Sequence, residues 1–260
     1  MTKNSGLWYQ MREIVVETGE IALFARRFFR EVFNPPYEFR ELLKQSYIIG
    51  NKSIFLVATT GFIMGLVLTL QTRPTMSQFG AEAWMPAMVG ISIVREIGPV
   101  ITALICAGKI GSSIGAELGS MKVTEQIAAM EVSGTNPFKY LVITRVVAAT
   151  LMVPLLVIIA DGVALTGSYL VEHVKGNVSM QLYFSQVFRN ITFGDLVPAT
   201  VKTFFFGFAI GIVGCYKGYT SKKGTAGVGR AANSAVVVSS LFLFIIDFIA
   251  VLIADIFFEL

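Results

Sequence analysis

The chain has 260 residues, of which 54% are hydrophobic and only 15% are charged, and its mean hydropathy is +0.69. Soluble domains carry about 25% charged residues, so this composition excludes an ordinary soluble protein and indicates a membrane protein. The net charge of +4 is too small to predict a nucleic-acid partner. Both cysteines, Cys106 and Cys215, lie inside apolar stretches, which gives no support to a disulfide framework or a cysteine-built metal site.

The first predicted element is an amphipathic helix within residues 1–47, a region too charged to cross a membrane. Apolar residues such as Ile21, Ala25 and Phe28 recur at three- and four-residue steps, and charged residues fill much of the other face. Pro35-Pro36 is expected to end this helix. We expect it to lie in the membrane interface with its apolar face among acyl chains. The alternative is a helix packed on the rest of the protein.

Five apolar windows follow, each near the length of about 20 residues that a helix needs to cross a bilayer. They cover residues 48–70, 84–107, 140–164, 196–216 and 235–258. Their apolar runs are continuous rather than alternating, which excludes a β-barrel. The sequence therefore predicts an all-α polytopic fold, with five transmembrane helices in a domain spanning residues 48–260.

Basic residues in the short connections predict the orientation of these spans. Seven follow the second and fourth windows, against three on the other side: Lys109, Lys122, Lys139, Lys217, Lys222, Lys223 and Arg230, against Arg73, Lys175 and Arg189. We therefore expect a cytoplasmic N-terminus and, after an odd number of crossings, place Leu260 on the opposite side of the membrane. The acidic residues Glu13, Glu17 and Glu20 are unlike a transit segment, which favours a bacterial inner membrane over a plastid envelope.

Several charged residues lie inside the apolar windows, and four of them are singled out here. Arg95 and Glu96 are in the second, Lys202 is in the fourth and Asp247 is in the fifth. Each charge costs about 2.5–3.5 kcal/mol at mid-span, so it should face protein, water or another charge. A Gly-Pro pair at 98–99 predicts a kinked or interrupted second span. An interhelical salt-bridge network is one interpretation, and contact with a lipid headgroup and a proton pathway are the others.

Small residues recur at four-residue steps, a spacing that lets helix backbones approach closely. The pairs and triplet are Gly61/Gly65, Gly207/Gly211, Gly214/Gly218 and Gly111/Gly115/Gly119. This pattern predicts a tightly packed core and leaves open a homodimer seam.

The connection 108–139 is longer than a minimal turn between two spans. Thr124 is suited to cap a short helix over about 124–132. Ile127 and Met130 share one face of that helix, and Met121 extends the patch. A charged rim around these apolar residues is typical of a docking surface for a cytoplasmic protein. The alternative, equally supported, is a helix folded back onto the bundle.

Catalytic motifs are absent from the sequence. Neither a nucleotide-binding P-loop nor an H-E-x-x-H zinc motif occurs. The single histidine, His173, lies in a predicted loop with no cysteine near it. We therefore expect no enzymatic activity, no cofactor and no metal. If the chain takes part in transport driven by ATP, the nucleotide must be bound by another chain.

Three segments together resemble a known family. They are Arg95-Glu96-Ile97-Gly98-Pro99-Val100, continuing through 107–145, and the stretch 215–240 that leads into Ile246-Asp247-Phe248. In order and content they resemble the permease subunits of the maintenance-of-lipid-asymmetry (Mla) ABC transporters, from about residue 40 to the end. The resemblance implies a five-span homodimer with an interfacial N-terminal helix. It also implies a cytoplasmic ABC ATPase partner, a ring of MCE-domain proteins on the periplasmic side and a phospholipid substrate.

The resemblance also assigns roles to individual residues. Segment 108–139 would contain the coupling helix that meets the ATPase, with these contributors: Glu117, Met121, Lys122, Glu125, Ile127, Met130 and Glu131. A lipid cavity between the two copies would be lined by Leu68, Met76, Phe79, Arg95, Glu96 and Ile97. Lys202 and Asp247 would complete an intramembrane charge network.

The expected function is therefore that of a permease subunit, which moves phospholipid between the inner membrane and the MCE-domain partner and contributes to outer-membrane lipid asymmetry. Two other classes stay open. One is an ion- or proton-coupled carrier that uses the intramembrane charges as a relay. The other is a passive membrane scaffold for a lipid-binding ring.

Overall fold

A computed structural model describes residues 4–222 and 224–258. These residues form helices, and no β-strand occurs among them, which confirms the all-α class. Five helical runs are long and apolar enough to cross a membrane, and each contains or overlaps one predicted window: Phe39–Gln78, Glu82–Val123, Phe138–Gly176, Phe193–Tyr219 and Thr225–Phe257.

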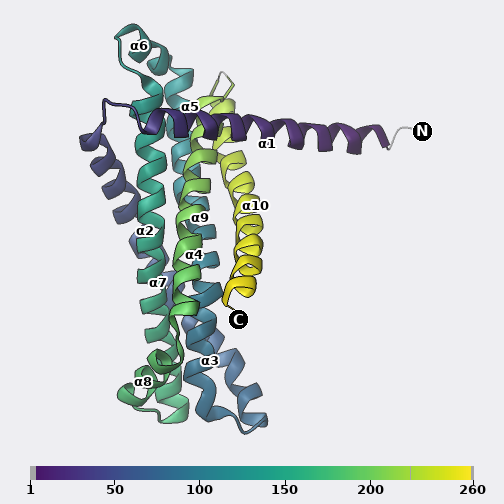
Figure 1. Cartoon of the computed structure of the whole chain (residues 1–260), viewed down its shortest axis with the longest axis vertical. Coiled ribbons are helices and arrows are strands. Elements are labelled where there is room, and N and C mark those ends of the chain that lie inside the picture. Colours follow the sequence, from purple (N-terminus) through teal and green to yellow (C-terminus); the bar gives the residue numbers. More distant parts are fainter. Residues whose placement is uncertain (1–3, 223, 259–260) are drawn as a thin grey trace.

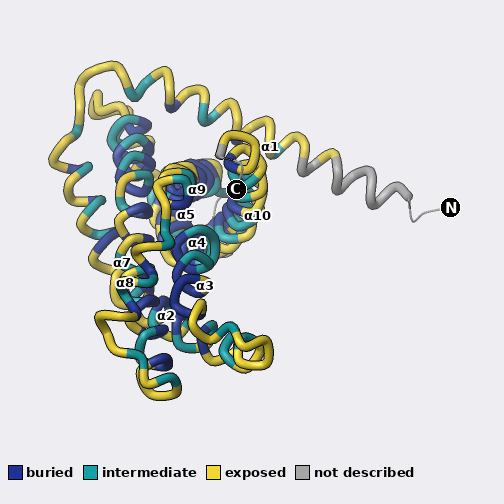
Figure 2. The backbone as a smooth tube through the Cα atoms, turned by 60° about the horizontal axis from the view of Figure 1, so that its bottom comes forward, coloured by how far each residue is buried: buried dark blue, intermediate teal, exposed yellow. Residues whose placement is uncertain are grey.

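The five runs lie side by side along the longest axis of the molecule (Figure 1). The uninterrupted members are α2 (Phe39–Gln78), α9 (Phe193–Tyr219) and α10 (Thr225–Phe258), while α7 (Thr144–Gly176) follows a π-helical turn at Phe138–Ile143. We call one end of the bundle the α1 end, where α1, α5 and α6 lie, and the other the α8 end, where α3 and α8 lie (Figure 1). Buried residues concentrate in the helices at the centre of the bundle (Figure 2).

Helix α1 (Asn4–Val32) lies crosswise to the spans at one end of the bundle (Figure 1). Its buried side chains Ile21 and Phe28 belong to the main core, and Phe24 packs edge-on against Phe138. Val15 and other apolar side chains of α1 are exposed. The helix ends shortly before Pro35-Pro36, as predicted. One apolar face thus packs on the bundle while further apolar surface stays open, and a position in the membrane interface stays a prediction.

The regularly spaced glycines lie where helices of this chain pack closely against one another. Helices α2 and α7 share the most extensive helix pairing in the bundle. A Cβ atom added at Gly65 would lie 1.9 Å from the carbonyl oxygen of Ala164, and one at Gly61 would lie 2.8 Å from that of Ala160. Gly207 of α9 packs on α7 in the same way, because a Cβ atom added there would lie 2.5 Å from the Ala149 carbonyl oxygen. Close backbone approach therefore confirms the tightly packed core.

The second span continues further than predicted. It runs through α3 (Met85–Ser92), a π-helical turn at Ile93–Ile97, α4 (Gly98–Cys106), a second π-helical turn at Ala107–Gly111 and α5 (Ser112–Val123). Lys109 and Lys122, expected in a loop, thus lie in helices. The prediction failed because the extension is held by protein contacts that a hydropathy window does not detect. Gly115, for example, lies against the backbone of Ala231 in α10.

The short helix in the connection, α6 (Gln126–Val132), is present, but its predicted cap was wrong. Thr124 closes α5 instead, and its hydroxyl donates to the Ser120 carbonyl at 2.9 Å. Glu125 occupies the N-cap position with a φ of 59°. Ile127 is only 2% exposed and lies in the main core. The interpretation of Ile127 as part of an exposed patch was therefore wrong, because the apolar face of α6 folds back onto the bundle.

A further helix, α8 (Met180–Asn190), lies where the sequence analysis expected only a loop. Its N-cap Ser179 accepts a hydrogen bond from the Leu182 amide, and Tyr183 and Val187 pack into a second apolar cluster. The Tyr183 hydroxyl donates to Ser168 of α7 at 2.7 Å. Burial raises the pKa of Tyr183 to about 12, so this phenol stays protonated and keeps its donor. The periodic Tyr183 and Val187 were the sequence signal for this helix.

Candidate functional site

The intramembrane charges form a network that joins three spans. Lys202 of α9 is 3% exposed, and its ammonium group donates to Glu96 Oε2 at 2.6 Å and to Asp247 Oδ1 at 3.0 Å. Glu96 belongs to the second span and Asp247 to the fifth. These three residues thus form the interhelical contacts that the salt-bridge interpretation expects. A buried ammonium group with two carboxylate partners avoids the cost of an isolated charge in the membrane.

The π-helical turn Ile93–Ile97 directs two neighbouring charges toward the same helix. The guanidinium nitrogen Nη1 of Arg95 lies 3.7 Å from Asp195 Oδ1, while Glu96 accepts from Lys202. Asp195 and Lys202 lie about 10 Å apart along α9. The predicted interruption near Gly98-Pro99 is confirmed as a π-helical turn directly before this pair, a feature frequent at functional sites.

Asp195 was missed as a partner because it lies just outside the predicted fourth window. It is the N3 residue of a capping box at the start of α9, in which Thr192 is the N-cap. Its Oδ2 accepts from the Thr192 amide at 3.0 Å, which leaves Oδ1 directed toward Arg95. A threonine followed three residues later by an acidic residue was the available signal.

Two further charges in the third span were also missed, although the rule that selected Arg95 applies to them. The buried Arg145 donates to Glu117 Oε1 at 2.9 Å and to the Leu141 carbonyl at 3.0 Å. The buried Oδ1 atom of Asp161 points toward Gly98, the first residue of α4. A Cβ atom added to Gly98 would lie 1.8 Å from this oxygen. No hydrogen-bond partner of that oxygen occurs within residues 4–222 and 224–258. The Asp161 carboxylate therefore lies against the interruption of the second span.

The residues expected to line a lipid cavity do not form one group in a single copy. Leu68 and Met76 pack against the apolar cluster at the α8 end, which includes Ile93. Phe79, directly after α2, is 80% exposed. Arg95 and Glu96 instead face α9 and α10, and Ile97 is half-buried beside them in the same turn.

A small cavity adjoins the network, with a volume of about 10 Å³. Arg95, Glu96 and Lys202 form one side of it, and the small α10 residues Ala250 and Ala254 form another. Ligand pockets usually measure about 300–1,000 Å³, so this space is far too small for a phospholipid.

Comparison with known proteins decides the family. The sequence profile of the family described as Permease MlaE matches residues 42–253. The chain belongs to the MlaE permease family. A probable ABC transporter permease protein of Rickettsia typhi is 42% identical over 231 residues, 89% of each chain. A similar protein of Rickettsia bellii is 40% identical over 241 residues, 93% of this chain and 92% of the relative. Protein TRIGALACTOSYLDIACYLGLYCEROL 1, chloroplastic, of Arabidopsis thaliana is 32% identical over 210 residues, 81% of this chain and 60% of the relative.

Membership of the MlaE permease family makes this chain a multi-pass membrane subunit of an ABC transporter, which implies an ATPase partner. It also indicates a transporter subunit rather than an enzyme. Within the described residues, no group of three or more His, Cys, Asp or Glu side chains is arranged to hold a metal ion.

The residues assigned to coupling gather at the α1 end, but in different environments. Ile127 is buried, and Met121 and Met130 are partly buried against the same core. Glu117 pairs with Arg145, and the Lys122 ammonium group lies 5.5 Å from the centre of the Tyr219 ring. Glu125 and Glu131 are exposed. Val132 is the large apolar side chain of α6 that is exposed, at 90%, and the sequence analysis did not select it.

Proposed function

We propose that this MlaE-family chain is the membrane-spanning subunit of an ATP-driven phospholipid transporter. It would move lipid between the bacterial inner membrane and an MCE-domain partner on the periplasmic side, and so contribute to outer-membrane lipid asymmetry. The name of the Arabidopsis relative contains that of a glycolipid, which supports a lipid substrate. One observation carries the proposal. The neighbouring residues Arg95 and Glu96 lie on a π-helical turn inside the second span, and each contacts an oppositely charged residue of α9.

Arg95 is the group we propose for the lipid phosphate. Its side chain is 30% exposed, and its contact with Asp195 is a long one, at 3.7 Å. A guanidinium has five N–H donors in a planar fork, so donors are left that could bind two phosphate oxygens. Lys202 is different, because it is buried between Glu96 and Asp247. We therefore assign ligand contact to Arg95 and a positioning role to Lys202.

We further propose that a second copy of the chain completes the lipid cavity. The space beside the network is only about 10 Å³ in one copy, and its α10 wall consists of Ala250, Val251 and Ala254. The same part of α10 presents large apolar side chains outward, including Phe248, Leu252 and Ile256. A second copy against this surface would enclose apolar walls next to Arg95, which an acyl chain and its headgroup require.

The continuous helical run Glu82–Val123 provides the mechanical connection. It extends from the turn that carries Arg95 and Glu96 to α5, and α6 follows after two residues. We propose that the ATPase contacts α6, and that its movement on ATP binding shifts this run and the network attached to it. Rigid helices transmit such displacements over long distances because packed interfaces adopt discrete arrangements.

The proposed orientation places the α1 end in the cytoplasm. It is supported by the excess of basic residues in the connections at that end. The C-terminus would then be periplasmic. Leu260 itself lies outside the described residues, and the described part of α10 ends short of the level of α3 and α8 (Figure 1).

A test of the ATPase contact uses Val132 of α6. Replacing it with glutamate should reduce the amount of co-purifying ATPase about tenfold or more, because a charge would enter an apolar contact. Val174→Glu is the matched control. Val174 is also exposed, at 71%, but it lies in the last turn of α7, at the opposite end of the bundle from α6. Mass spectrometry of chains and lipids that co-elute in mild detergent gives the readout. Equal ATPase recovery with both variants would contradict this docking site.

A further inference from the structure

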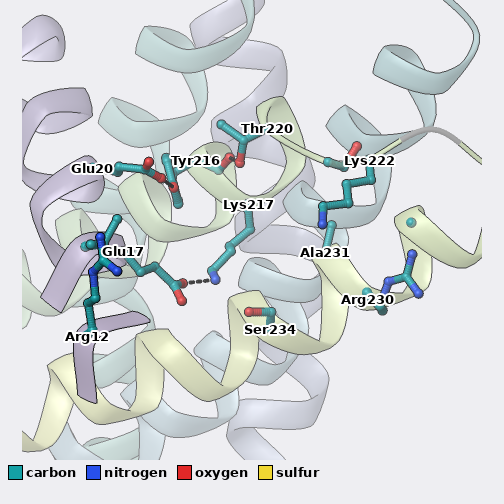
Figure 3. Close-up of a pocket in the computed structure, with 13 residues that line it drawn as sticks. Arg12, Glu17, Glu20, Tyr216, Lys217, Thr220, Lys222, Arg230, Ala231 and Ser234 are labelled. Carbon is teal, nitrogen blue, oxygen red and sulfur yellow. Dashed lines mark hydrogen bonds and ion pairs between the residues drawn. The ribbon is translucent and has the colours of Figure 1, made fainter. Parts of the chain in front are cut away.

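A second and much larger cavity lies at the α1 end of the bundle (Figure 3). Its volume is about 1120 Å³, and its walls are α1, the end of α9 and the start of α10. Lys217 in this cavity and Lys202 in the charge network lie about 22 Å apart along α9. The cavity is therefore separate from the site proposed for transport.

The charges of the lining favour an anion. Four basic and two acidic residues contribute, so two net positive charges face the cavity. Both acidic residues are engaged, because Glu17 pairs with Lys217 and Glu20 accepts from the Tyr216 hydroxyl. The remaining basic residues, Arg12, Lys222 and Arg230, have no carboxylate within ion-pair distance in the described part of the chain. Arg12 lies on the α1 side of the cavity, and Lys222 and Arg230 lie on the opposite side (Figure 3). An anion in the cavity would neutralise these three basic side chains, which have no carboxylate partner of their own among the described residues.

The surface next to the cavity is suited to acyl chains. Arg230 and Ser234 line the cavity from α10, and Val237 and Leu241 continue the same face of that helix at three- and four-residue steps. Val237 and Leu241 are both exposed, and no other segment in the described chain covers them. A ligand with a phosphate in the cavity and apolar chains on this part of α10 would satisfy both surfaces. Leu241 lies about 10 Å along the helix from Phe248, so these chains would leave the surface of Phe248, Leu252 and Ile256 to the second copy.

We propose that this cavity binds the phosphate of an anionic glycerophospholipid from the leaflet at the α1 end. The lipid would be held beside α1 as a resident ligand rather than as transported cargo. Arg12, Lys222 and Arg230 would bind the headgroup, and the acyl chains would lie on α10. A basic side chain at an anionic membrane surface strengthens binding about fivefold, so the cluster distinguishes anionic from zwitterionic lipid.

The test measures lipid retention by the full chain in its ATPase complex. The complex is placed in nanodiscs of phosphatidylcholine with phosphatidylglycerol, extracted into detergent and analysed by native mass spectrometry. Lys222→Gln with Arg230→Gln should lower the retained phosphatidylglycerol at least about fivefold. Arg26→Gln is the control, because Arg26 is an exposed arginine of α1 outside the cavity. Thermal unfolding of both variants verifies that they fold.

Four outcomes would overturn the proposal. Retention of phosphatidylglycerol could be unchanged in the double variant, or it could be reduced equally by Arg26→Gln. Inorganic phosphate could displace the bound species as well as phosphatidylglycerol does, which would show a site for a free anion. Finally, the double variant could lose the ATPase while keeping its lipid, which would show that the basic cluster contacts protein.

Discussion

Replacing Lys202 with methionine should lower the free energy of unfolding by about 3–5 kcal/mol, because it leaves two intramembrane carboxylates without their cation. Lys202 is nearly fully buried and contacts Glu96 and Asp247 at 2.6 and 3.0 Å. Methionine keeps much of the apolar length of lysine, so the loss reports on charge rather than on volume. Unfolding of the purified protein in mixed detergent micelles measures the change.

A triple variant tests the cause of that loss. Adding Glu96→Gln and Asp247→Asn to Lys202→Met removes the unpaired charges, so most of the lost stability should return. The network would be contradicted if Lys202→Met alone were as stable as the natural chain. It would also be contradicted if the triple variant were no more stable than Lys202→Met.

Adding one methyl group at Gly65 should destabilise the protein by about 1–3 kcal/mol or more, as overpacking does. The new Cβ atom would lie 1.9 Å from the Ala164 carbonyl oxygen, which is backbone and therefore moves only if α2 and α7 separate. We expect Gly65→Ala to lower both the midpoint of thermal unfolding and the yield of folded protein in detergent.

Gly162→Ala on α7, the helix that packs against α2, is the control variant, and we expect it to cause no loss of stability. No atom lies within 4 Å of a Cβ atom added at Gly162. Alanine is the better helix former by about 0.5–1 kcal/mol, so this change should be neutral or stabilising. If both alanine variants changed stability by the same amount, the close approach of α2 and α7 at Gly65 would be refuted.

The sequence predicts the spans well because their physical requirement is local. An apolar run near the thickness of the bilayer has few alternatives to a helix, and all five windows are helical in the structure. Helix ends were harder to predict. The second span continues to Val123 because Gly115 and neighbouring residues pack on α9 and α10, and such contacts depend on residues more than a hundred positions away.

The candidate site was predictable in kind but not in pairing. The cost of a charge in lipid selected Arg95, Glu96, Lys202 and Asp247, and the Gly-Pro pair at 98–99 indicated the interruption. Which carboxylate faces which cation depends on the relative rotation of three helices, which sequence periodicity does not give. Arg95 therefore meets Asp195, a residue assigned to no window.

Helix α6 illustrates the same limit. The spacing of Ile127 and Met130 correctly placed them on one face. Periodicity does not tell whether such a face meets solvent, a partner or the protein's own core. The structure shows the third case, which moves the proposed ATPase contact from Ile127 to the exposed Val132.

The central proposal is phospholipid movement driven by ATP in a partner subunit. The most direct measurement is transfer of a labelled phospholipid from proteoliposomes that contain this chain and its ATPase. Transfer should occur with ATP and stop with a non-hydrolysable analogue or without the ATPase. Transfer that follows a pH gradient without ATP or a partner would contradict the proposal and favour an ion-coupled carrier, and binding of a periplasmic ring with no lipid movement under any condition would favour a passive scaffold.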